Sequence, residues 1–221
     1  YTIKTSKEEF KEFDVSEKGL SDDEAKARRG KFGPNTIAEK KVRGWEIFVR
    51  QLRSPFIYLL IVAALLTFVL KEYIDGIMII LFVLVNTLLG FYQEFRSEQT
   101  LDLLKQYTIP KAKVRRNGKE IVINSQDIVP GDVVTIEPGD IVPCDIRFVE
   151  TQSLVIDESI LTGESAPVKK INTPLESSTK EIYKAENVGF SGTSVVGGKG
   201  VGVVFATGKD TSIGEITHLV A

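Results

Sequence analysis

The residues best suited to chemistry lie together in one stretch, Leu161-Thr162-Gly163-Glu164-Ser165. This stretch places a carboxylate, that of Glu164, between two hydroxyl groups and beside a glycine. Taken alone, such a stretch also fits a surface turn in which the Glu164 carboxylate is simply solvated. Its meaning therefore depends on the elements that hold it and on the other reactive groups of the chain.

Other common chemistries have few candidate residues. Cys144 is the only cysteine and His218 the only histidine. An internal disulfide and a thiolate metal cage are therefore excluded, as are most zinc sites and any His-based triad. Gly197-Gly198-Lys199-Gly200 resembles a Walker loop only in part, because Gly192 is one residue out of register and Gly200 stands where Ser or Thr belongs. We interpret this segment as a glycine-rich hairpin turn.

The composition argues against a nucleic-acid partner. The chain has 221 residues, enough for one large or two small domains, and its 28 basic residues nearly balance its 30 acidic residues. No charged segment followed by an apolar stretch opens the chain, so we expect no secretory signal. Because the chain starts at Tyr1 rather than Met, we expect a fragment of a longer protein or a processed chain.

Two uncharged apolar runs, Phe56–Leu70 and Ile77–Tyr92, predict a pair of membrane helices. At ~1.5 Å per residue the first run is somewhat short of a ~30 Å hydrocarbon core, so we expect its helix to extend into Ile47–Leu52. A short polar break, Lys71–Gly76, separates the two runs. The alternative is a helical hairpin buried in a soluble core, but uncharged runs of this length with basic flanks are uncommon in soluble folds.

Basic residues predict the orientation in the membrane. The loop between the runs has only Lys71. The outer flanks of the runs contain many more lysines and arginines: Lys40, Lys41, Arg43, Arg50, Arg53, Arg96, Lys105 and Lys111. By the positive-inside rule, both chain ends are cytoplasmic and the loop is outside. We expect the second helix to continue as a polar stalk over Glu94–Gln106 and to end by Pro110.

Beyond the stalk the hydrophobic pattern changes from helix to strand. Ala112–Arg116 and Lys119–Ile123 alternate around Asn117-Gly118, a favoured type I′ hairpin turn. Pro-Gly-Asp turns begin at Pro130 and Pro138. Further strands are expected over Asp127–Val129, Val133–Ile136, Ile146–Val149, Leu154–Ile156, Asn187–Val196 and Val201–Ala206. Many short strands with turn signals predict a small antiparallel sandwich or jelly roll.

The N-terminal stretch predicts two short helices, Ser6–Phe13 and Ser21–Phe32, that pack as a cap on the β domain. Ser21 and Glu24 form a candidate capping box. Gly33-Pro34-Asn35 stops the second helix.

Thr162-Gly163-Glu164-Ser165 resembles the signature loop of the actuator domain of P-type ATPases. Further blocks resemble the same family in the same order: Gly33-Pro34-Asn35, Asn86, Gln93-Glu94, Asp127–Asp132, Gly139–Arg147, Asp157–Pro167, Phe190–Thr193, Thr207-Gly208 and Thr211–Glu215. The resemblance spans nearly the whole chain. It implies a membrane helical hairpin and a mainly-β actuator domain, a distorted antiparallel jelly roll. The expected segments are an N-terminal helical part over 1–40, membrane helices with their stalks over 41–106 and a β-rich part over 107–221.

The resemblance also implies a role for each residue of the loop. In this family an aspartate of another domain accepts the γ-phosphoryl group of ATP, and the actuator loop then approaches that aspartyl phosphate. Glu164 is expected to orient and deprotonate the attacking water. Gly163 lets the backbone come close to the phosphate, while Thr162 and Ser165 donate hydrogen bonds to water or phosphate oxygens. Mg²⁺ and a lysine of the partner domain would offset the repulsion between carboxylate and phosphate.

The family's phosphorylation motif, Asp-Lys-Thr-Gly-Thr, is absent from the chain, and Gly208–Thr211 is only superficially similar to it. We therefore expect the chain to bind neither ATP nor Mg²⁺ and to be inactive alone. ATP and Mg²⁺ would serve the whole pump. The expected partners are the rest of the same polypeptide (phosphorylation and nucleotide-binding domains and later membrane helices), the lipid bilayer and the transported cation.

The identity of the cation stays open at this stage. The absence of Cys pairs disfavours soft metals. The resemblance favours calcium, with sodium/potassium or proton pumps as alternatives, and neither apolar run contains an acidic residue that could bind the ion. A non-catalytic, membrane-anchored β domain with a regulatory role is another interpretation. A soluble sugar- or nucleotide-binding jelly roll is disfavoured by the two apolar runs.

Overall fold

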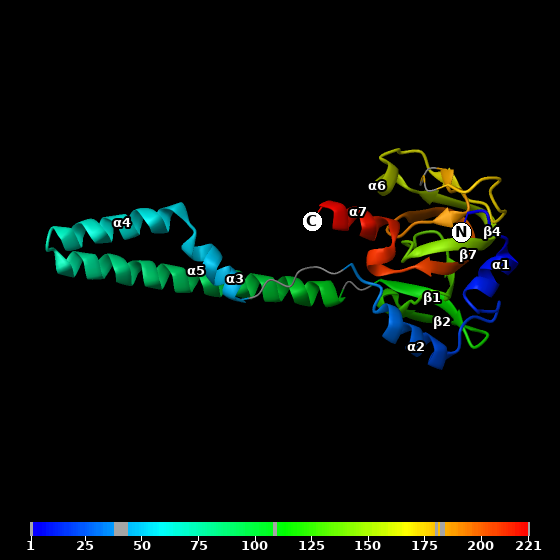
Figure 1. Cartoon of the computed structure of the whole chain (residues 1–221), viewed down its shortest axis with the longest axis horizontal. Helices are drawn as coiled ribbons and strands as arrows, with labels where there is room; N and C mark the ends of the chain where they lie inside the picture. Colours follow the sequence, from blue (N-terminus) through cyan, green and yellow to red (C-terminus); the bar gives the residue numbers. More distant parts are fainter. Residues whose placement is uncertain (1, 38–43, 108–109, 180, 182–183, 221) are drawn as a thin grey trace. The chain divides into compact units, whose positions relative to one another are not determined.

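The computed structural model describes residues 2–37, 44–107, 110–179, 181 and 184–220. The chain divides into two compact units (Figure 1). The sheet unit combines Tyr1–Ala38 with Ile109–Ala221, and the helical unit is Glu39–Thr108. The expected boundary between residues 40 and 41 lies outside the described residues, as do Lys40, Lys41 and Arg43.

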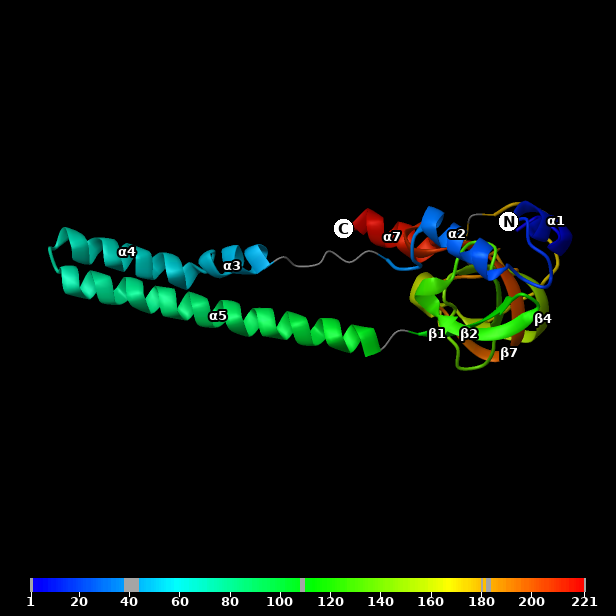
Figure 2. The same cartoon turned by 90° about the horizontal axis from the view of Figure 1, so that it is seen from below.

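The helical unit contains α3 (Gly44–Leu52), α4 (Pro55–Val69) and α5 (Tyr73–Tyr107). Helices α4 and α5 pack side by side in both views (Figures 1 and 2). Helix α5 is continuous over 35 residues, so the second apolar run and the predicted stalk form one helix.

Two expectations for this unit are wrong. The first apolar helix does not extend straight into Ile47–Leu52, because α3 and α4 are separate helices bent by 57°. Pro55 occupies the first turn of α4, where its fixed φ and missing N–H favour a new helix start. The polar break is also shorter than Lys71–Gly76, since α5 already begins at Tyr73.

Most large apolar side chains of the helical unit face outward. Leu59 is 64% exposed, Leu66 58% and Leu81 50%. Within the described residues, α5 is long and apolar enough to cross a membrane, since an 18-residue window within Tyr73–Leu101 has a mean hydropathy of 2.3. Helices α3 and α4 would supply a second span only if the bent pair acts as one.

The sheet unit is built on one antiparallel sheet, with the strand order β2-β1-β3-β7-β4-β5 and β6 beside β4 in the described part of the chain. Its strands are β1 (Lys111–Arg116), β2 (Lys119–Asn124), β3 (Val133–Ile136), β4 (Asp145–Asp157), β5 (Val168–Lys169), β6 (Val188–Gly189) and β7 (Ser194–Ala206). The strands curve around a common interior (Figure 2). The main core there is wholly apolar and includes Ile136, Ile146, Phe148, Leu154, Ile156 and Val204.

The predicted turns of the first half of the sheet are confirmed. Asn117 and Gly118 have φ of 51° and 73°, as a type I′ turn requires, and they set Arg116 opposite Lys119. Gly131 and Gly139 of the two Pro-Gly-Asp turns also have positive φ, 93° and 90°. The expected strand over Asp127–Val129 is wrong: a short 3₁₀ helix, Ser125–Asp127, ends there, and Ile128 and Val129 follow it outside any strand.

The second half of the sheet differs more from the prediction. Ile146–Val149 and Leu154–Ile156 are parts of a single 13-residue strand, β4. The expected pair over Asn187–Val196 and Val201–Ala206 is also wrong, because β7 runs unbroken from Ser194 to Ala206. Gly197–Gly200 therefore lies inside a strand and makes no hairpin turn. The physical reason is the fit between neighbouring backbones: Gly198 has φ +74°, and a Cβ there would lie 2.2 Å from the carbonyl oxygen of Ser153.

Helices α1 (Ser6–Glu12) and α2 (Asp22–Phe32) pack on the sheet, as predicted for the N-terminal stretch. Ser21 Oγ accepts from the backbone N of Glu24 at 3.2 Å, while the Glu24 carboxylate pairs with Arg28 instead of completing a capping box. Phe10, Phe13 and Val15 cover the outer valines of the sheet, namely Val133, Val149, Val201 and Val203. Side chains on the two faces of β3 and β7 therefore pack into two different apolar clusters.

Candidate functional site

The expected site residues follow β4 directly. Ser159–Thr162 forms the short helix α6 at the margin of the sheet unit (Figure 1). Gly163 ends this helix in the left-handed conformation, with φ 74° and its N–H bonded to the carbonyl oxygen of Ser159 at 2.9 Å. Leu161 and Thr162 therefore belong to a helix, and the loop proper starts at Gly163.

Hydrogen bonds within the segment fix its shape. Thr162 Oγ1 donates to the carbonyl oxygen of Glu158 at 3.1 Å and accepts from the backbone N of Glu164 at 3.2 Å. Asp157 Oδ1 accepts from the backbone N of Ser159 at 2.9 Å, which fixes the start of α6. The Thr162 proton is thus used inside the loop, so Thr162 acts here through the backbone of its neighbours.

The tip of the loop is open to solvent. Gly163, Glu164 and Ser165 are all exposed, whereas Thr162 is partly buried. Among the residues that the structure describes, none forms a hydrogen bond or ion pair with the Glu164 carboxylate. The structure thus brings the four expected residues together on one surface, with a carboxylate available for a group that approaches from outside.

A charged pair lies beneath this loop. Lys170 Nζ is 2.6 Å from Oε1 of Glu158, and each side chain is 1% exposed. Burial raises the pKa of Glu158 and lowers the pKa of Lys170, in each case against the attraction of the partner. Neither residue is predicted from the sequence to belong to the site, although Glu158 lies in the block Asp157–Pro167 that resembles the family. Their spacing around the loop was visible, but their burial was not.

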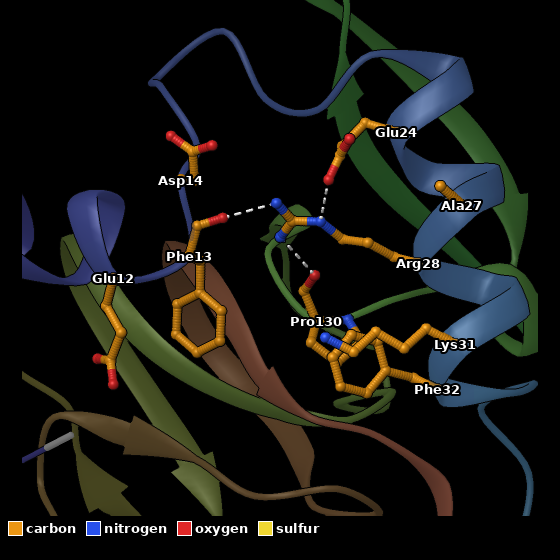
Figure 3. Close-up of a pocket in the computed structure, with 9 residues that line it drawn as sticks. All are labelled: Glu12, Phe13, Asp14, Glu24, Ala27, Arg28, Lys31, Phe32 and Pro130. Atoms are coloured by element: carbon orange, nitrogen blue, oxygen red, sulfur yellow. Dashed lines mark hydrogen bonds and ion pairs between the residues drawn. The ribbon is translucent and has the colours of Figure 1, made fainter.

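A separate hollow of about 440 Å³ lies between α1, α2 and Pro130 (Figure 3). The guanidinium of Arg28 is already engaged there: Nε donates to Glu24, Nη1 to the Pro130 carbonyl oxygen and Nη2 to the Phe13 carbonyl oxygen. Arg28 therefore ties the N-terminal helices to the sheet unit. None of the four loop residues lines this hollow.

Metal binding has no candidate within the described ranges: no group of three or more His, Cys, Asp or Glu there could hold a metal ion.

Family comparison agrees with this arrangement of a sheet unit and an apolar helical unit. Residues 106–221 match the model of the P-type ATPase actuator domain, and residues 1–67 match that of the cation transporter/ATPase N-terminus. The chain belongs to the P-type ATPase family. The loop Thr162–Ser165 lies inside the part that matches the actuator domain.

Individual members of the P-type ATPase family are similar over most of the chain. A calcium-transporting ATPase of Bacillus subtilis is 40% identical over 91% of this chain. A probable cation-transporting ATPase F of Mycobacterium tuberculosis is 42% identical over 91%, and a calcium-transporting ATPase of Listeria monocytogenes is 37% identical over 98%. The chain spans about a quarter of the length of these curated relatives, between 22% and 25%.

Proposed function

We propose that this chain is the actuator and first membrane-helix part of an ATP-driven cation pump, and that Glu164 promotes hydrolysis of an aspartyl phosphate formed elsewhere in the pump. The observation that supports this role most directly is the geometry of the loop. Its one carboxylate is exposed and unpaired in the described part of the chain, at the end of a segment fixed by its own hydrogen bonds. Such a group can meet an external phosphate without first breaking an internal contact.

Each loop residue has a distinct task in this proposal. Glu164 orients the attacking water and accepts its proton, as a general base. Gly163, without a Cβ, lets the backbone approach the phosphate closely. Ser165, exposed beside Glu164, donates a hydrogen bond to water or to a phosphate oxygen. Thr162 holds the backbone N of Glu164 and so sets the direction of the loop.

The helical unit is proposed to be a membrane hairpin, with both its ends and the sheet unit cytoplasmic. The outward apolar faces of α4 and α5 support a lipid environment. The short turn between them has one lysine, Lys71, whereas Arg50, Arg53 and Arg96 lie toward the other end. We further propose that the curved antiparallel sheet is a distorted jelly roll.

Calcium is proposed as the transported cation, because two of the similar proteins are named calcium-transporting ATPases. Sodium/potassium and proton transport remain the alternatives. ATP and Mg²⁺ belong, in this proposal, to the phosphorylation and nucleotide-binding domains of the same polypeptide. The same domains supply the aspartate and the lysine that meet the loop.

A second candidate function is a membrane-anchored regulatory β domain without hydrolytic chemistry. It uses the same two units but gives Glu164 no role. The two candidates differ in what substitution of Glu164 does to the phosphorylated pump.

The test is a Glu164→Gln variant of the complete pump. We expect normal phosphorylation by ATP but loss of the phosphate slowed by about a hundredfold or more, since a general base is removed. The measurement is decay of the radiolabelled aspartyl phosphate after a chase with unlabelled ATP. Glu150→Gln, which changes an exposed carboxylate in the middle of β4, should leave the decay unchanged. Normal decay in Glu164→Gln would reject the hydrolytic role and favour the regulatory one.

A further inference from the structure

The buried pair of Glu158 and Lys170 has no task in the hydrolysis described above. The two residues stand on either side of the loop in sequence: Glu158 directly precedes α6 and Lys170 directly follows β5. Their side chains meet at 2.6 Å beneath the loop. The ion pair therefore closes the segment 158–170 at its base, while Gly163, Glu164 and Ser165 are exposed at its tip.

Backbone contacts connect Glu158 to the reactive end of the loop. Its carbonyl oxygen accepts from the backbone N of Leu161 at 2.9 Å, from the backbone N of Thr162 at 3.0 Å and from Thr162 Oγ1 at 3.1 Å. Thr162 Oγ1 in turn accepts from the backbone N of Glu164. Only two hydrogen bonds thus separate Glu158 from the backbone of Glu164.

Lys170 is fixed by the sheet unit on its other sides. Its backbone N donates to the Leu154 carbonyl oxygen of β4 at 2.9 Å, and its Nζ donates to the Ala185 carbonyl oxygen at 3.2 Å. The Nζ also lies 5.7 Å from the centre of the Phe190 ring. With 1% of its side chain exposed, Lys170 is available to Glu158 and to these groups but not to a phosphate at the surface.

We propose that Glu158 and Lys170 are positioning residues, whose ion pair sets the orientation of α6 and thereby the direction in which Glu164 leaves the surface. This inference rests on the proposed hydrolytic role of Glu164. An apolar pair of similar volume would stabilise the core about as well, because desolvation offsets much of the attraction between buried charges. What the charged pair adds is a defined geometry, with one short contact to the carboxylate and one hydrogen bond from the ammonium group to the Ala185 carbonyl oxygen.

The decisive variant of the complete pump is Glu158→Gln with Lys170→Met, which removes both charges and leaves no unpaired ion. We expect phosphorylation by ATP to be unchanged and decay of the aspartyl phosphate to slow by about tenfold to a hundredfold, as for a reacting group displaced by about 1 Å. The single variants Glu158→Gln and Lys170→Met, where they fold, should slow the decay by about the same factor, because each of them breaks the same ion pair. Glu158→Asp, which keeps the charge but shortens the side chain, is the variant to use if the others do not fold.

A matched control is a second buried ion pair of the sheet unit, that of Arg116 and Asp132. Arg116 Nη2 lies 2.7 Å from Asp132 Oδ2, and these side chains are 11% and 0% exposed. Arg116→Met with Asp132→Asn should destabilise the unit but leave the decay of the folded pump at its normal rate. Amide hydrogen exchange of Gly163 and Glu164 provides a readout independent of hydrolysis, and it should become faster in the Glu158/Lys170 variants only.

The possible outcomes separate this inference from the proposed function. Normal decay and normal exchange in the Glu158/Lys170 double variant and in Glu158→Asp, with slow decay in Glu164→Gln, would overturn the positioning role alone. Slow decay in the Arg116/Asp132 control would overturn it too, because any loss of stability would then have the same effect. A lower level of phosphorylation by ATP together with slower decay would overturn it as well, because both steps would then be damaged. Normal decay in Glu164→Gln would remove the proposed function itself, whatever the pair does.

Discussion

At the scale of single residues, the glycines of β7 decide how closely two long strands can pack. A Cβ at Gly200 would lie 2.7 Å from a methyl carbon of Leu154, and one at Gly202 would lie 2.3 Å from a methyl carbon of Ile146. Both distances are too short for two non-bonded carbon atoms. The space that side chains at these two glycines would need is thus occupied by side chains of β4. A glycine-rich segment such as Gly197–Gly200 is also typical of a turn, which is why the prediction of a hairpin turn was wrong here.

Gly198→Ala is expected to destabilise the sheet unit by about 2 kcal/mol or more. The left-handed conformation alone costs about 1–2 kcal/mol for a residue with a Cβ, and the clash with the Ser153 carbonyl oxygen adds to it. The midpoint of thermal unfolding should fall by about 4–8 °C. Reaction of Cys144 with a maleimide dye at rising temperature measures this, because Cys144 is the only cysteine and is fully buried in the folded chain.

The adjacent glycine provides the control for that prediction. Gly197 is not among the glycines with positive φ, and a Cβ there would meet nothing within 4 Å. Gly197→Ala should therefore leave the midpoint unchanged or raise it slightly, since alanine loses less conformational freedom on folding. Equal losses of stability in the two variants would contradict this interpretation of β7.

At the scale of elements, the sequence predicted what depends on local signals. The Asn117-Gly118 turn, the stop of α2 at Gly33 and the continuous helix through the stalk follow from dihedral preferences and apolar periodicity. The lengths of β4 and β7 could not be predicted in this way. The irregular backbone at Ser153 and at Gly198 depends on contact between these two strands, which are far apart in the sequence. The four loop residues could be found from their resemblance to a family motif, whereas Glu158 and Lys170 could not, since burial depends on the packed fold.

The turn between α4 and α5 is expected to lie outside the membrane, on the side opposite the sheet unit. Cysteine placed at Glu72 in the turn should react with an impermeant reagent only from outside sealed vesicles. Cysteine placed at Lys113 on β1 should react only from the cytoplasmic side. The unsubstituted chain is the control, because its buried Cys144 should give no signal from either side. Reaction of position 72 from the cytoplasmic side alone would reject this topology.

At the scale of the whole molecule, the helical unit is an insertion within the chain of the sheet unit. Asn35, near the first connection, donates to the carbonyl oxygens of Ser125 and Pro143 and accepts from the backbone N of Gly208. Asp145 accepts from the backbone N and Oγ of Ser212, at the start of α7 (Ser212–Val220). Asn35 thus ties the segment before the helical unit to three segments of the sheet unit, and Asp145 ties the start of α7 to β4. Both chain connections between the two units start from the sheet unit, which is the arrangement that the proposed coupling of hydrolysis to helix movement needs.

The chain alone is expected to fold but not to hydrolyse ATP. The sheet unit completes its own core from residues 1–38 and 109–221, so cooperative unfolding is expected without any other domain. Hydrolysis needs a phosphorylated aspartate and a nucleotide pocket, for which the sequence offers no motif.

The test is the unfolding midpoint of the purified chain with and without ATP. Ligand binding to the folded state would raise this midpoint by mass action. Because no ATP binding is expected, millimolar ATP should produce no rise in the temperature at which Cys144 reacts. The Gly198→Ala variant, with its expected fall of a few degrees, is the control for the sensitivity of the assay. A clear rise with ATP would reveal a nucleotide site within these residues. Turnover by the purified chain would contradict the divided site itself, and Glu164 would then have to act with a catalytic partner inside this chain.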